Sequence, residues 1–179
     1  MKVIQKGWYV IYTKPRHEKK VFEDLTLRKC NAYLPLVNRR SQWSDRRKTV
    51  EKPLFSSYVF VYLNNVASYH RVLGVDGFIM FISFGGRLAM VKDSEIETIK
   101  QLIAHCHEVE LVQSDIKIGE KRKILFGPLS GYDCEAVSYK GKDRIMVRIE
   151  SLRQDIMAEL PVECLVGDDV FNLSIYDKK

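Results

Sequence analysis

The chain has 179 residues, of which 46% are hydrophobic and 29% are charged, the balance of an ordinary folded protein. Its longest apolar runs, 58–63 and 78–84, are far shorter than the roughly 18 residues that a membrane-spanning helix needs. The N-terminus has no signal-peptide pattern, so we expect a cytoplasmic protein without a membrane partner. The four cysteines include no C-x-x-C pair, which argues against a disulfide framework or a cysteine zinc site.

Positive charge is concentrated in the first part of the chain. Residues 1–110 carry 18 Lys and Arg against 11 Asp and Glu, a net charge of +7, whereas residues 111–179 carry 11 against 12, a net charge of −1. Such a local surplus favours a surface that binds a polyanion, and nucleic acid is the first candidate. A basic solvated surface without a ligand is the alternative.

The first part of the chain mixes helical and strand patterns. A strand over 8–12 precedes a helix whose first turn contains Pro15. Strand-like runs follow in four stretches: 33–37, 57–63, 78–83 and 88–91. We therefore expect an α+β domain with one antiparallel sheet covered by helices.

Two local signals lie near the end of this part. Gly85-Gly86 predicts a tight turn before 88–91. Ser94 and Glu97 form a capping-box pattern, which predicts a second helix from about 95 to 106.

After residue 106 the pattern changes to short strands. Alternating segments recur about every ten residues, and they are 121–126, 134–139, 144–149 and 155–160. Gly127-Pro128 and Lys140-Gly141 mark turns between them. We expect a small all-β barrel of about 50 residues.

One predicted strand has two apolar faces. Alternation in 58–63 places Tyr58, Phe60 and Tyr62 on one face and three aliphatic side chains on the other. The aliphatic face is expected to pack beneath the helices. The aromatic face is either ordinary core, which the residues alone favour, or a surface that needs a partner.

Basic residues form two clusters. The first lies around the start of the first predicted helix, where the helix dipole favours phosphate. Its members are Lys14, Arg16, Lys19 and Lys20. The second lies in a basic hairpin or loop with Trp43, which either stacks on a base or pins the loop. Its members are Arg39, Arg40, Arg46, Arg47, Lys48 and Lys52, opposed by Asp45 and Glu51.

The common catalytic motifs are absent from the sequence. No phosphate loop, dinucleotide fingerprint, nucleophile elbow or zincin motif occurs. His105-Cys106-His107 is the densest group of possible ligands, but alternate residues on a helix do not converge on one metal. We therefore expect no catalytic residue, no metal and no cofactor, and an enzyme ranks last among the functions considered.

Three segments taken together resemble the NusG family of transcription elongation factors. They are WYVIYTKPRHEKK at 8–20, PLFSSYVFV at 53–61 and FGPLSG at 126–131. The stretch 42–55 is most similar to UpxY-type, RfaH-like specialised antiterminators, which act on long polysaccharide operons. Ser56-Ser57 stand where the family usually has Pro-Gly.

The resemblance implies a fold of two domains. An α+β NGN domain with an antiparallel sheet and helices is expected over 1–108, and a linker over 109–117. A small all-β KOW domain, an SH3-like barrel, is expected over 118–166, followed by a C-terminal extension over 167–179.

The resemblance also implies a function in transcription. In the family, the NGN domain binds the clamp helices of RNA polymerase through a hydrophobic hollow and contacts the non-template DNA strand, which suppresses pausing or termination. The polymerase-binding residues implied here are Tyr12, Phe55, Tyr58, Phe60, Ser68, Tyr69, His70 and Arg71. The DNA-binding residues implied here are Lys14, Arg16, Lys19, Lys20, Arg46, Arg47 and Lys48.

Leu129 matches the KOW loop that contacts Rho or a small-subunit ribosomal protein. A monomer is expected. The main alternative is a ribosome-associated or RNA-binding KOW module, because small KOW barrels also occur in ribosomal proteins. That alternative does not account for the aromatic face.

Overall fold

The computed structural model describes residues 4–43, 46–112, 120–124, 129–139 and 142–159. The chain divides into two compact units. Unit 1 comprises Met1–Lys100 and Ile149–Arg153, and unit 2 comprises Gln101–Arg148 and Gln154–Lys179. In the part of the chain that is described, no helix has the length and apolar character that crossing a membrane requires.

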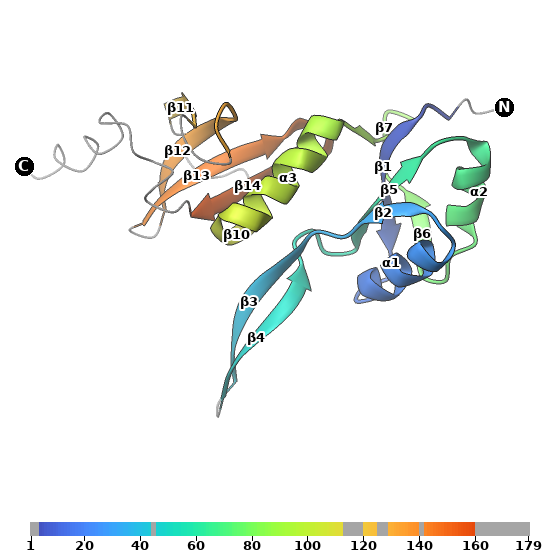
Figure 1. Ribbon diagram of the computed structural model, residues 1–179, viewed down its shortest axis with the longest axis horizontal. Helices are drawn as coiled ribbons and strands as arrows, with labels where there is room; N and C mark the ends of the chain where they lie inside the picture. The colour runs from blue at the N-terminus through green and yellow to red at the C-terminus, as the bar shows by residue number, and fades with distance from the viewer. Residues whose placement is uncertain (1–3, 44–45, 113–119, 125–128, 140–141, 160–179) are drawn as a thin grey trace, which may run out of the picture. The chain divides into compact units, whose positions relative to one another are not determined.

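Unit 1 is built on an antiparallel sheet with the strand order β2-β5-β1-β6 (Figure 1). Its strands are β1 (Gly7–Thr13), β2 (Asn31–Tyr33), β5 (Tyr58–Leu63) and β6 (Phe78–Phe81), and β9 (Met90–Val91) also pairs with β1. The central strands β1 and β5 are rich in aromatic and β-branched residues, which favour a pleated sheet. The strands predicted over 8–12 and 57–63 are confirmed.

Two helices contribute to a shared core on one face of this sheet. Helix α1 (Glu18–Leu27) supplies Val21 and Leu25, and helix α2 (Val66–Leu73) supplies Val72. The same buried cluster contains sheet residues from β1 and β5: Tyr9, Ile11, Val59, Val61 and Leu63. The prediction that the aliphatic face of 58–63 packs beneath helices is confirmed.

Helix α2 is not predicted by the sequence pattern. It begins with a capping box in which the Ser68 N–H donates to Asn65 Oδ1 at 2.9 Å and the Asn65 N–H donates to Ser68 Oγ at 3.1 Å. Asparagine and serine in these positions depart from the usual Ser/Thr-x-x-Glu/Gln signature. Eight residues are also too few to establish a helical period.

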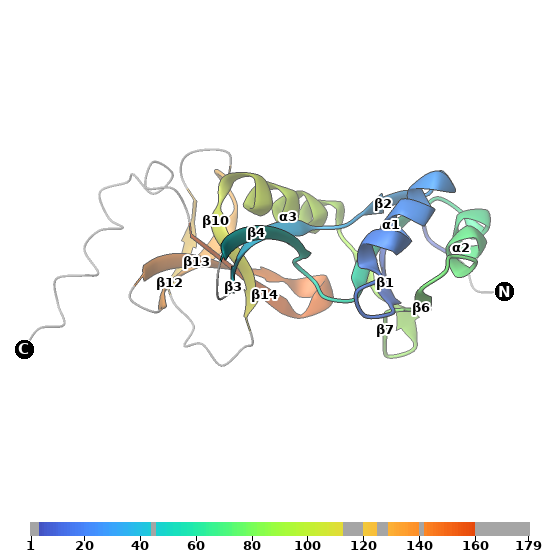
Figure 2. The ribbon, with the colours of Figure 1, turned by 90° about the horizontal axis from the view of Figure 1, so that it is seen from below.

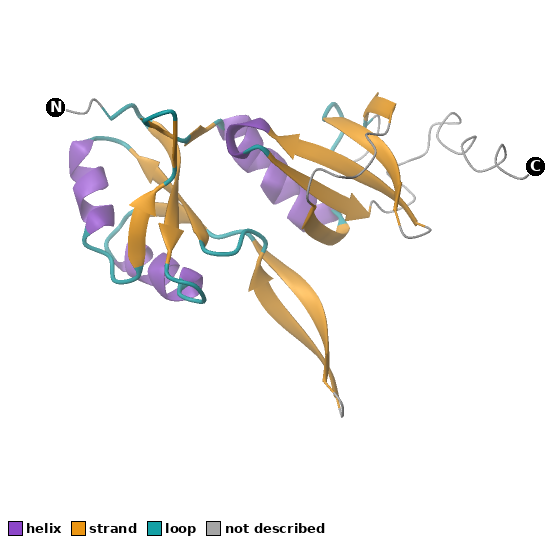
Figure 3. Cartoon of the chain, turned by 180° about the vertical axis from the view of Figure 1, so that it is seen from behind, coloured by secondary structure: helices purple, strands orange, loops and turns teal. Residues whose placement is uncertain are grey.

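A two-stranded ribbon extends from unit 1. Strands β3 (Leu36–Trp43) and β4 (Arg46–Pro53) pair without a register shift from Leu36↔Pro53 to Trp43↔Arg46, side by side in Figures 1 and 2. Figures 1 and 3 show this ribbon as an arm that leads away from the sheet. Of the hairpin and loop alternatives for the second basic cluster, the hairpin is the one observed.

Two bonds hold the base of the arm. The Leu54 N–H donates to the Pro35 carbonyl at 2.8 Å, which joins the two chain segments that flank the arm. Lys19 Nζ, on α1, donates to Glu51 Oε2, on β4, at 2.8 Å.

The segment after β6 forms a small hairpin and a third helix. Strands β7 (Ser83–Phe84) and β8 (Arg87–Leu88) flank Gly85-Gly86, whose φ values of +57° and +76° confirm the predicted glycine turn. Helix α3 (Asp93–His105) confirms the second predicted helix.

The cap of α3 differs from the prediction. The side chain of Glu95 accepts a hydrogen bond from the Lys92 N–H at 2.9 Å, so the helix begins before the predicted Ser94–Glu97 box. A glutamate at the third helical position caps this start, and Ser94 already lies inside the helix.

Unit 2 contains a five-stranded antiparallel sheet with the order β10-β14-β13-β12-β11. Its strands are β10 (His107–Val112), β11 (Glu120–Lys123), β12 (Asp133–Tyr139), β13 (Lys142–Ile149) and β14 (Gln154–Glu159). The four strands predicted after residue 117 are confirmed within the described residues, and positions 125, 126 and 160 of the predicted ranges lie outside them. Within the described ranges, the pairings leave β10 and β11 as the two edges, so the closed barrel that was expected is not observed.

Strand β10 lies partly in the segment expected to be linker. Residues 109–112 pair with β14 through partners such as Leu111↔Ile156 and Val112↔Asp155, and Val109 is buried. The alternation of glutamate with valine and leucine in this stretch is a strand pattern with one buried face. The strand structure of unit 2 therefore begins before residue 118.

A buried arginine joins β10 to the middle of this sheet. Arg144 on β13 is 8% exposed, and its Nη1 and Nη2 donate to Glu110 Oε1 at 2.7 Å and Glu108 Oε2 at 2.5 Å. A buried guanidinium needs such carboxylate partners to compensate for its lost hydration.

Candidate functional site

Aromatic rings occupy the side of the unit 1 sheet opposite to the helical core. The β1–β5 register places Trp8 beside Tyr62 and Tyr12 beside Tyr58, with ring centroids 5.3 and 5.9 Å apart. Both pairs are edge-to-face, the arrangement that aromatic quadrupoles favour. The aromatic face inferred from the alternation in 58–63 is therefore present.

The rings implied in polymerase binding differ in their exposure. Phe60 is 0% exposed and Phe55 is 1% exposed, with ring centroids 5.4 Å apart, so both belong to the core. Tyr12 and Tyr58 are only partly buried. The tyrosine pair therefore forms the accessible surface, and the two phenylalanines support it.

A methionine extends this accessible surface onto the next strand. Met80 on β6 is the register partner of Tyr12 and is 50% exposed. The sequence analysis did not select Met80, because cross-strand register cannot be derived from local alternation. We call Tyr12, Tyr58 and Met80 the tyrosine surface.

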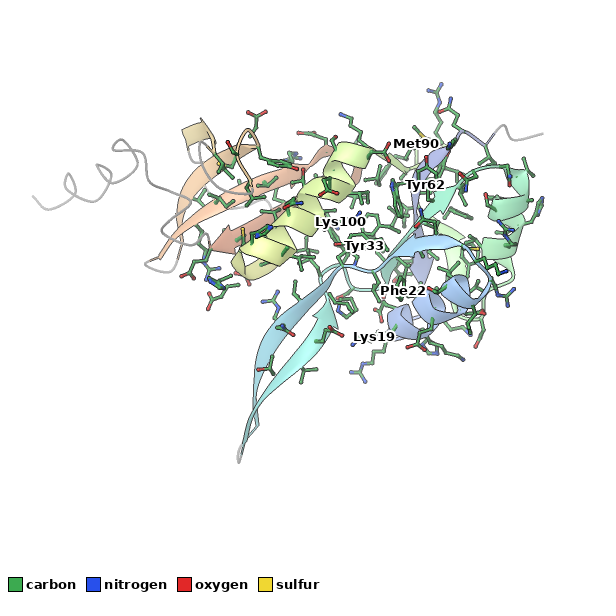
Figure 4. The ribbon with its side chains drawn as sticks, viewed as in Figure 1. Lys19, Phe22, Tyr33, Tyr62, Met90 and Lys100 are labelled. Carbon is green, nitrogen blue, oxygen red and sulfur yellow. The ribbon has the colours of Figure 1, made fainter. Side chains whose placement is uncertain are left out.

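Tyr33 illustrates how the rest of the aromatic face is covered. Its ring centroid lies 6.2 Å from that of Phe60, and Lys100 Nζ lies 5.6 Å from the Tyr33 ring centroid. Tyr33 and Lys100 are labelled in Figure 4. Burial, with a smaller contribution from the charge of Glu97, raises the pKa of Tyr33 to about 12. Tyr33 therefore stays neutral at physiological pH, and its ring packs beside that of Phe60 in the covered part of this face.

The turn before Tyr58 is held by a buried carboxylate. Ser57 has φ of +63°, a left-handed conformation that glycine adopts at less cost. The Ser57 N–H donates to Glu18 Oε1 at 2.7 Å, and the Thr13 N–H donates to the Ser57 carbonyl at 2.8 Å. These bonds fix the tyrosine surface to the end of β1 and the start of α1.

Glu18 is a residue that sequence reasoning missed. It is 7% exposed although it follows the basic segment 14–17 at the first position of α1. Its partner Ser57 lies 39 residues away in the chain, so only the three-dimensional structure shows the bond.

The first basic cluster is organised around one exposed aspartate. Lys20 Nζ lies 2.6 Å from Asp76 Oδ2, and Lys14 Nζ lies 3.8 Å from Asp76 Oδ1. The hydrogen bond and the charge of Lys20, followed by the charge of Lys14, lower the pKa of Asp76 below its usual value. Asp76 was not predicted, because it lies 56 residues from Lys20 in sequence.

The other members of this cluster have different surroundings. Lys19 bonds to Glu51 at the base of the arm. Arg16 is exposed with φ of +63°, and it makes no ion pair with any residue in the described ranges. The structure therefore brings Lys14 and Lys20 together at Asp76, whereas Lys19 is paired with Glu51 and Arg16 is exposed.

The implied contact segment 68–71 lies on α2. Ser68 is 2% exposed and caps the helix, and the Tyr69 ring stacks on Phe81 at 4.9 Å. Of these four residues, His70 and Arg71 are the exposed ones.

The remaining implied residues lie on the arm and in unit 2. Arg46, Arg47 and Lys48 occupy consecutive positions of β4. Leu129 is 1% exposed, so its side chain belongs to the interior of unit 2. Gly127-Pro128 and the extension 167–179 lie outside the described residues. Across the described ranges, no group of three or more His, Cys, Asp or Glu side chains is placed to hold a metal.

The sequence of this chain matches a known protein family over the region that carries these features. Residues 6–100 match the family model described as transcription termination factor nusG. The chain belongs to the NusG family. Membership places it among transcription factors rather than enzymes.

Individual relatives agree with the NusG family model. The transcription termination/antitermination protein NusG of Lactococcus lactis subsp. lactis (strain IL1403) is 25% identical over 168 residues, which cover 86% of this chain and 89% of the relative. A solved structure that describes domain interaction in Thermotoga maritima NusG has a TM-score of 0.52 and 23% identity, and the match covers 89% of this chain and 96% of that chain. The second likeness shows that the fold is NusG-like.

Proposed function

We propose that this chain is a transcription elongation and antitermination factor that binds the clamp helices of RNA polymerase through the tyrosine surface. The observation that carries the proposal is the partly buried, edge-to-face pair of Tyr12 and Tyr58 on the sheet, extended by the exposed Met80. Aromatic residues and methionine are enriched at the buried centres of protein interfaces. NusG family membership supports polymerase as the partner.

The basic residues beside this surface contact the non-template DNA strand in this proposal. Tyr12 and Lys14 are two residues apart in sequence, with the fully buried Thr13 between them. The polymerase contact and the phosphate contact are therefore held at a fixed spacing. Binding both partners closes the DNA cleft and disfavours the paused state, and no covalent bond is made or broken.

The proposal also assigns a specialised role and a second partner. The stretch 42–55, which is similar to UpxY-type and RfaH-like factors, favours antitermination in polysaccharide operons. Unit 2 is assigned as a KOW domain that binds Rho or a small-subunit ribosomal protein. Because the Leu129 side chain is buried, it shapes the partner-binding loop from inside.

Capture of purified RNA polymerase by the full-length chain tests the polymerase contact. Tyr58→Ala and Tyr12→Ala are each expected to weaken binding about 30-fold, the effect of losing an interface hot spot of about 2 kcal/mol. Leu27→Ala is the matched control, because Leu27 is an apolar side chain that is 82% exposed on α1.

Full retention of polymerase affinity by the folded tyrosine variants contradicts the proposal. Capture of ribosomal subunits from a lysate, with polymerase absent, points instead to the ribosome-associated alternative.

A further inference from the structure

A buried carboxylate lies at the start of helix α1. Glu18 is 7% exposed, although it is the first residue of α1 and follows a segment in which residues 14–16 are exposed. A carboxylate loses hydration on burial and needs hydrogen-bond donors in return. The Ser57 N–H is such a donor, 2.7 Å from Glu18 Oε1 and 39 residues away in the chain. The Glu18 carboxylate therefore holds a turn that is far from its own helix in sequence.

Both backbone polar groups of Ser57 are held by hydrogen bonds. Its N–H donates to Glu18, and its carbonyl accepts from the Thr13 N–H at 2.8 Å. The Ser57 carbonyl belongs to the planar peptide unit that leads into Tyr58, and the Thr13 N–H belongs to the unit that follows Tyr12. The two tyrosines are also register partners. The turn at Ser57 therefore sets the backbone on which both rings are mounted.

The Ser57 backbone has a conformation that needs support. Its φ of +63° lies in the left-handed region, which is unfavourable for a residue with a Cβ atom. Such a conformation persists when the surrounding contacts determine it. Because Glu18 supplies one of those contacts, loss of its oxygen allows Ser57 to adopt a negative φ. That change moves the peptide unit from which Tyr58 begins.

The rest of the sheet does not depend on this bond. The β1–β5 register continues from the tyrosines to Gly7↔Leu63, at the other end of the two strands. Val59 and Val61 are 0% exposed and belong to the core shared with the helices. We therefore expect loss of the Glu18 bond to disturb the end of the sheet that carries the tyrosine surface and to leave the core in place.

We propose that Glu18 is a positioning residue for polymerase binding, whose Oε1 holds the left-handed turn that presents Tyr58 beside Tyr12. This inference rests on the proposed function, which makes the tyrosine surface the polymerase contact. Glu18 is buried, so it acts through the tyrosines and not on the partner directly. The alternative is a local role at the helix N-terminus, where negative charge is favoured. That role needs the charge of Glu18, whereas the bond to Ser57 needs an oxygen at the reach of a glutamate.

Two conservative variants separate the position of the oxygen from the charge. Glu18→Gln keeps an acceptor oxygen at the same reach without the charge, and Glu18→Asp keeps the charge on a side chain one methylene shorter. Titration of purified RNA polymerase with each full-length variant, at a temperature where circular dichroism shows it folded, measures the affinity. Glu18→Gln is expected to bind within about 3-fold of the unaltered chain, and Glu18→Asp and Glu18→Ala about 10-fold more weakly.

The reverse order, in which Glu18→Asp retains affinity and Glu18→Gln loses it, assigns Glu18 to the helix N-terminus and overturns the proposal. Glu18→Asp keeps an acidic residue that suits this end of a helix, so the comparison holds even where Glu18→Ala does not fold. Glu23→Ala is the matched control, because Glu23 is an exposed glutamate on the same helix. It is expected to leave polymerase affinity unchanged.

Combined variants test whether Glu18 acts through the turn and the ring. Glu18→Ala added to Tyr58→Ala is expected to weaken binding less than about 3-fold further, because the ring that Glu18 positions is already absent. A further loss of about 10-fold means that Glu18 acts independently of Tyr58 and overturns the proposal. Ser57→Gly added to Glu18→Ala is expected to restore at least about 3-fold of the lost affinity, because glycine adopts a positive φ without support. Absence of any recovery overturns the role of the turn.

The single variants distinguish failure of this inference from failure of the proposed function. If Tyr58→Ala retains full polymerase affinity, the proposed function fails. If Tyr58→Ala loses affinity while the folded Glu18→Asp and Glu18→Ala variants bind as the unaltered chain does, this inference fails and the proposed function stands.

Discussion

Truncation of Phe60 separates a supporting role from a contact role within the aromatic face. Phe60 is 0% exposed on β5, and its ring is 5.4 Å from Phe55 and 6.2 Å from Tyr33. Phe60→Ala removes a ring from a site enclosed by two other rings, so the space cannot readily close. Replacing a core phenylalanine by alanine costs about 3–5 kcal/mol.

The expected loss is large on the scale of the whole fold. A small domain has a free energy of unfolding of about 5–15 kcal/mol. In a domain of 60–100 residues, each kcal/mol shifts the melting temperature by about 4–8 °C. Phe60→Ala is therefore expected to lower the melting temperature of unit 1 by more than about 10 °C.

Tyr58→Ala provides the comparison within the same strand. Tyr58 is partly buried and its edge-to-face contact with Tyr12 contributes about 0.5–1.5 kcal/mol. We expect a loss of about 1 kcal/mol in the free energy of unfolding and a fold that remains intact, with polymerase binding weakened about 30-fold. Circular dichroism melting and polymerase capture below the melting temperature measure the two effects on each variant.

Phe60→Leu is the control, because it keeps most of the apolar volume and is expected to cost less than about 1.5 kcal/mol. The reasoning is refuted if Phe60→Ala melts within about 2 °C of the unaltered chain and still loses polymerase. That result means that the Phe60 side chain contacts polymerase directly.

Four further changes have defined outcomes. Ser57→Gly relieves a left-handed serine and is expected to raise stability by about 0.5 kcal/mol, measured by thermal unfolding; a lower melting temperature means that the serine side chain itself stabilises the turn. Asp76→Asn frees the lysines that it binds, so oligothymidylate affinity is expected to rise several-fold at low salt, and weaker binding means that Asp76 positions them. Arg144→Ala removes the partner of two glutamates and is expected to lower the free energy of unfolding of unit 2 by about 3 kcal/mol in denaturant titration, whereas an unchanged midpoint argues against a structural role. Burial opposes ionisation of Glu95, but hydrogen bonds from Ser151 and from the Lys92 N–H outweigh it and lower the pKa of Glu95. The contribution of the Glu95 carboxylate to the free energy of unfolding is therefore complete above the ordinary pKa of 4.5 and is lost as the pH falls through the depressed pKa. Glu95→Gln is expected to flatten the acidic part of the profile of stability against pH.

The elements that the sequence predicts are those with a strong local pattern. The strand at 58–63 follows from alternation, and the turn at Gly85-Gly86 follows from the freedom of glycine at positive φ. Helix α2 has only eight residues and an Asn–Ser cap, so its local signal is weak. Strand β10 has a clear alternation, but its proximity to a helix end and its glutamates are equally typical of a connection.

The contacts that define the candidate site are mostly non-local. Glu18 reaches Ser57 across 39 residues, and Lys20 reaches Asp76 across 56 residues. Neither bond is indicated by the local sequence, because a glutamate beside lysines is typical of any solvated surface and no lysine lies near Asp76 in the chain. A single sequence therefore predicts which residues are basic or aromatic but not which of them are held together.

Exposure within the aromatic face depends on neighbours from other strands. Alternation assigns Tyr58 and Phe60 to the same face, yet the rings of Phe55 and Tyr33 pack against Phe60, while Tyr58 lies at the beginning of β5 with its ring against that of Tyr12. The accessible part of the face is therefore its end, next to the point where β1 continues to Lys14. The Lys14 N–H donates to the Gly77 carbonyl at 2.9 Å, which anchors that point to the turn that carries Asp76. A partner that contacts the tyrosines thus lies beside the lysine–aspartate cluster, and this proximity is the physical reason to expect the polymerase and DNA contacts to act together.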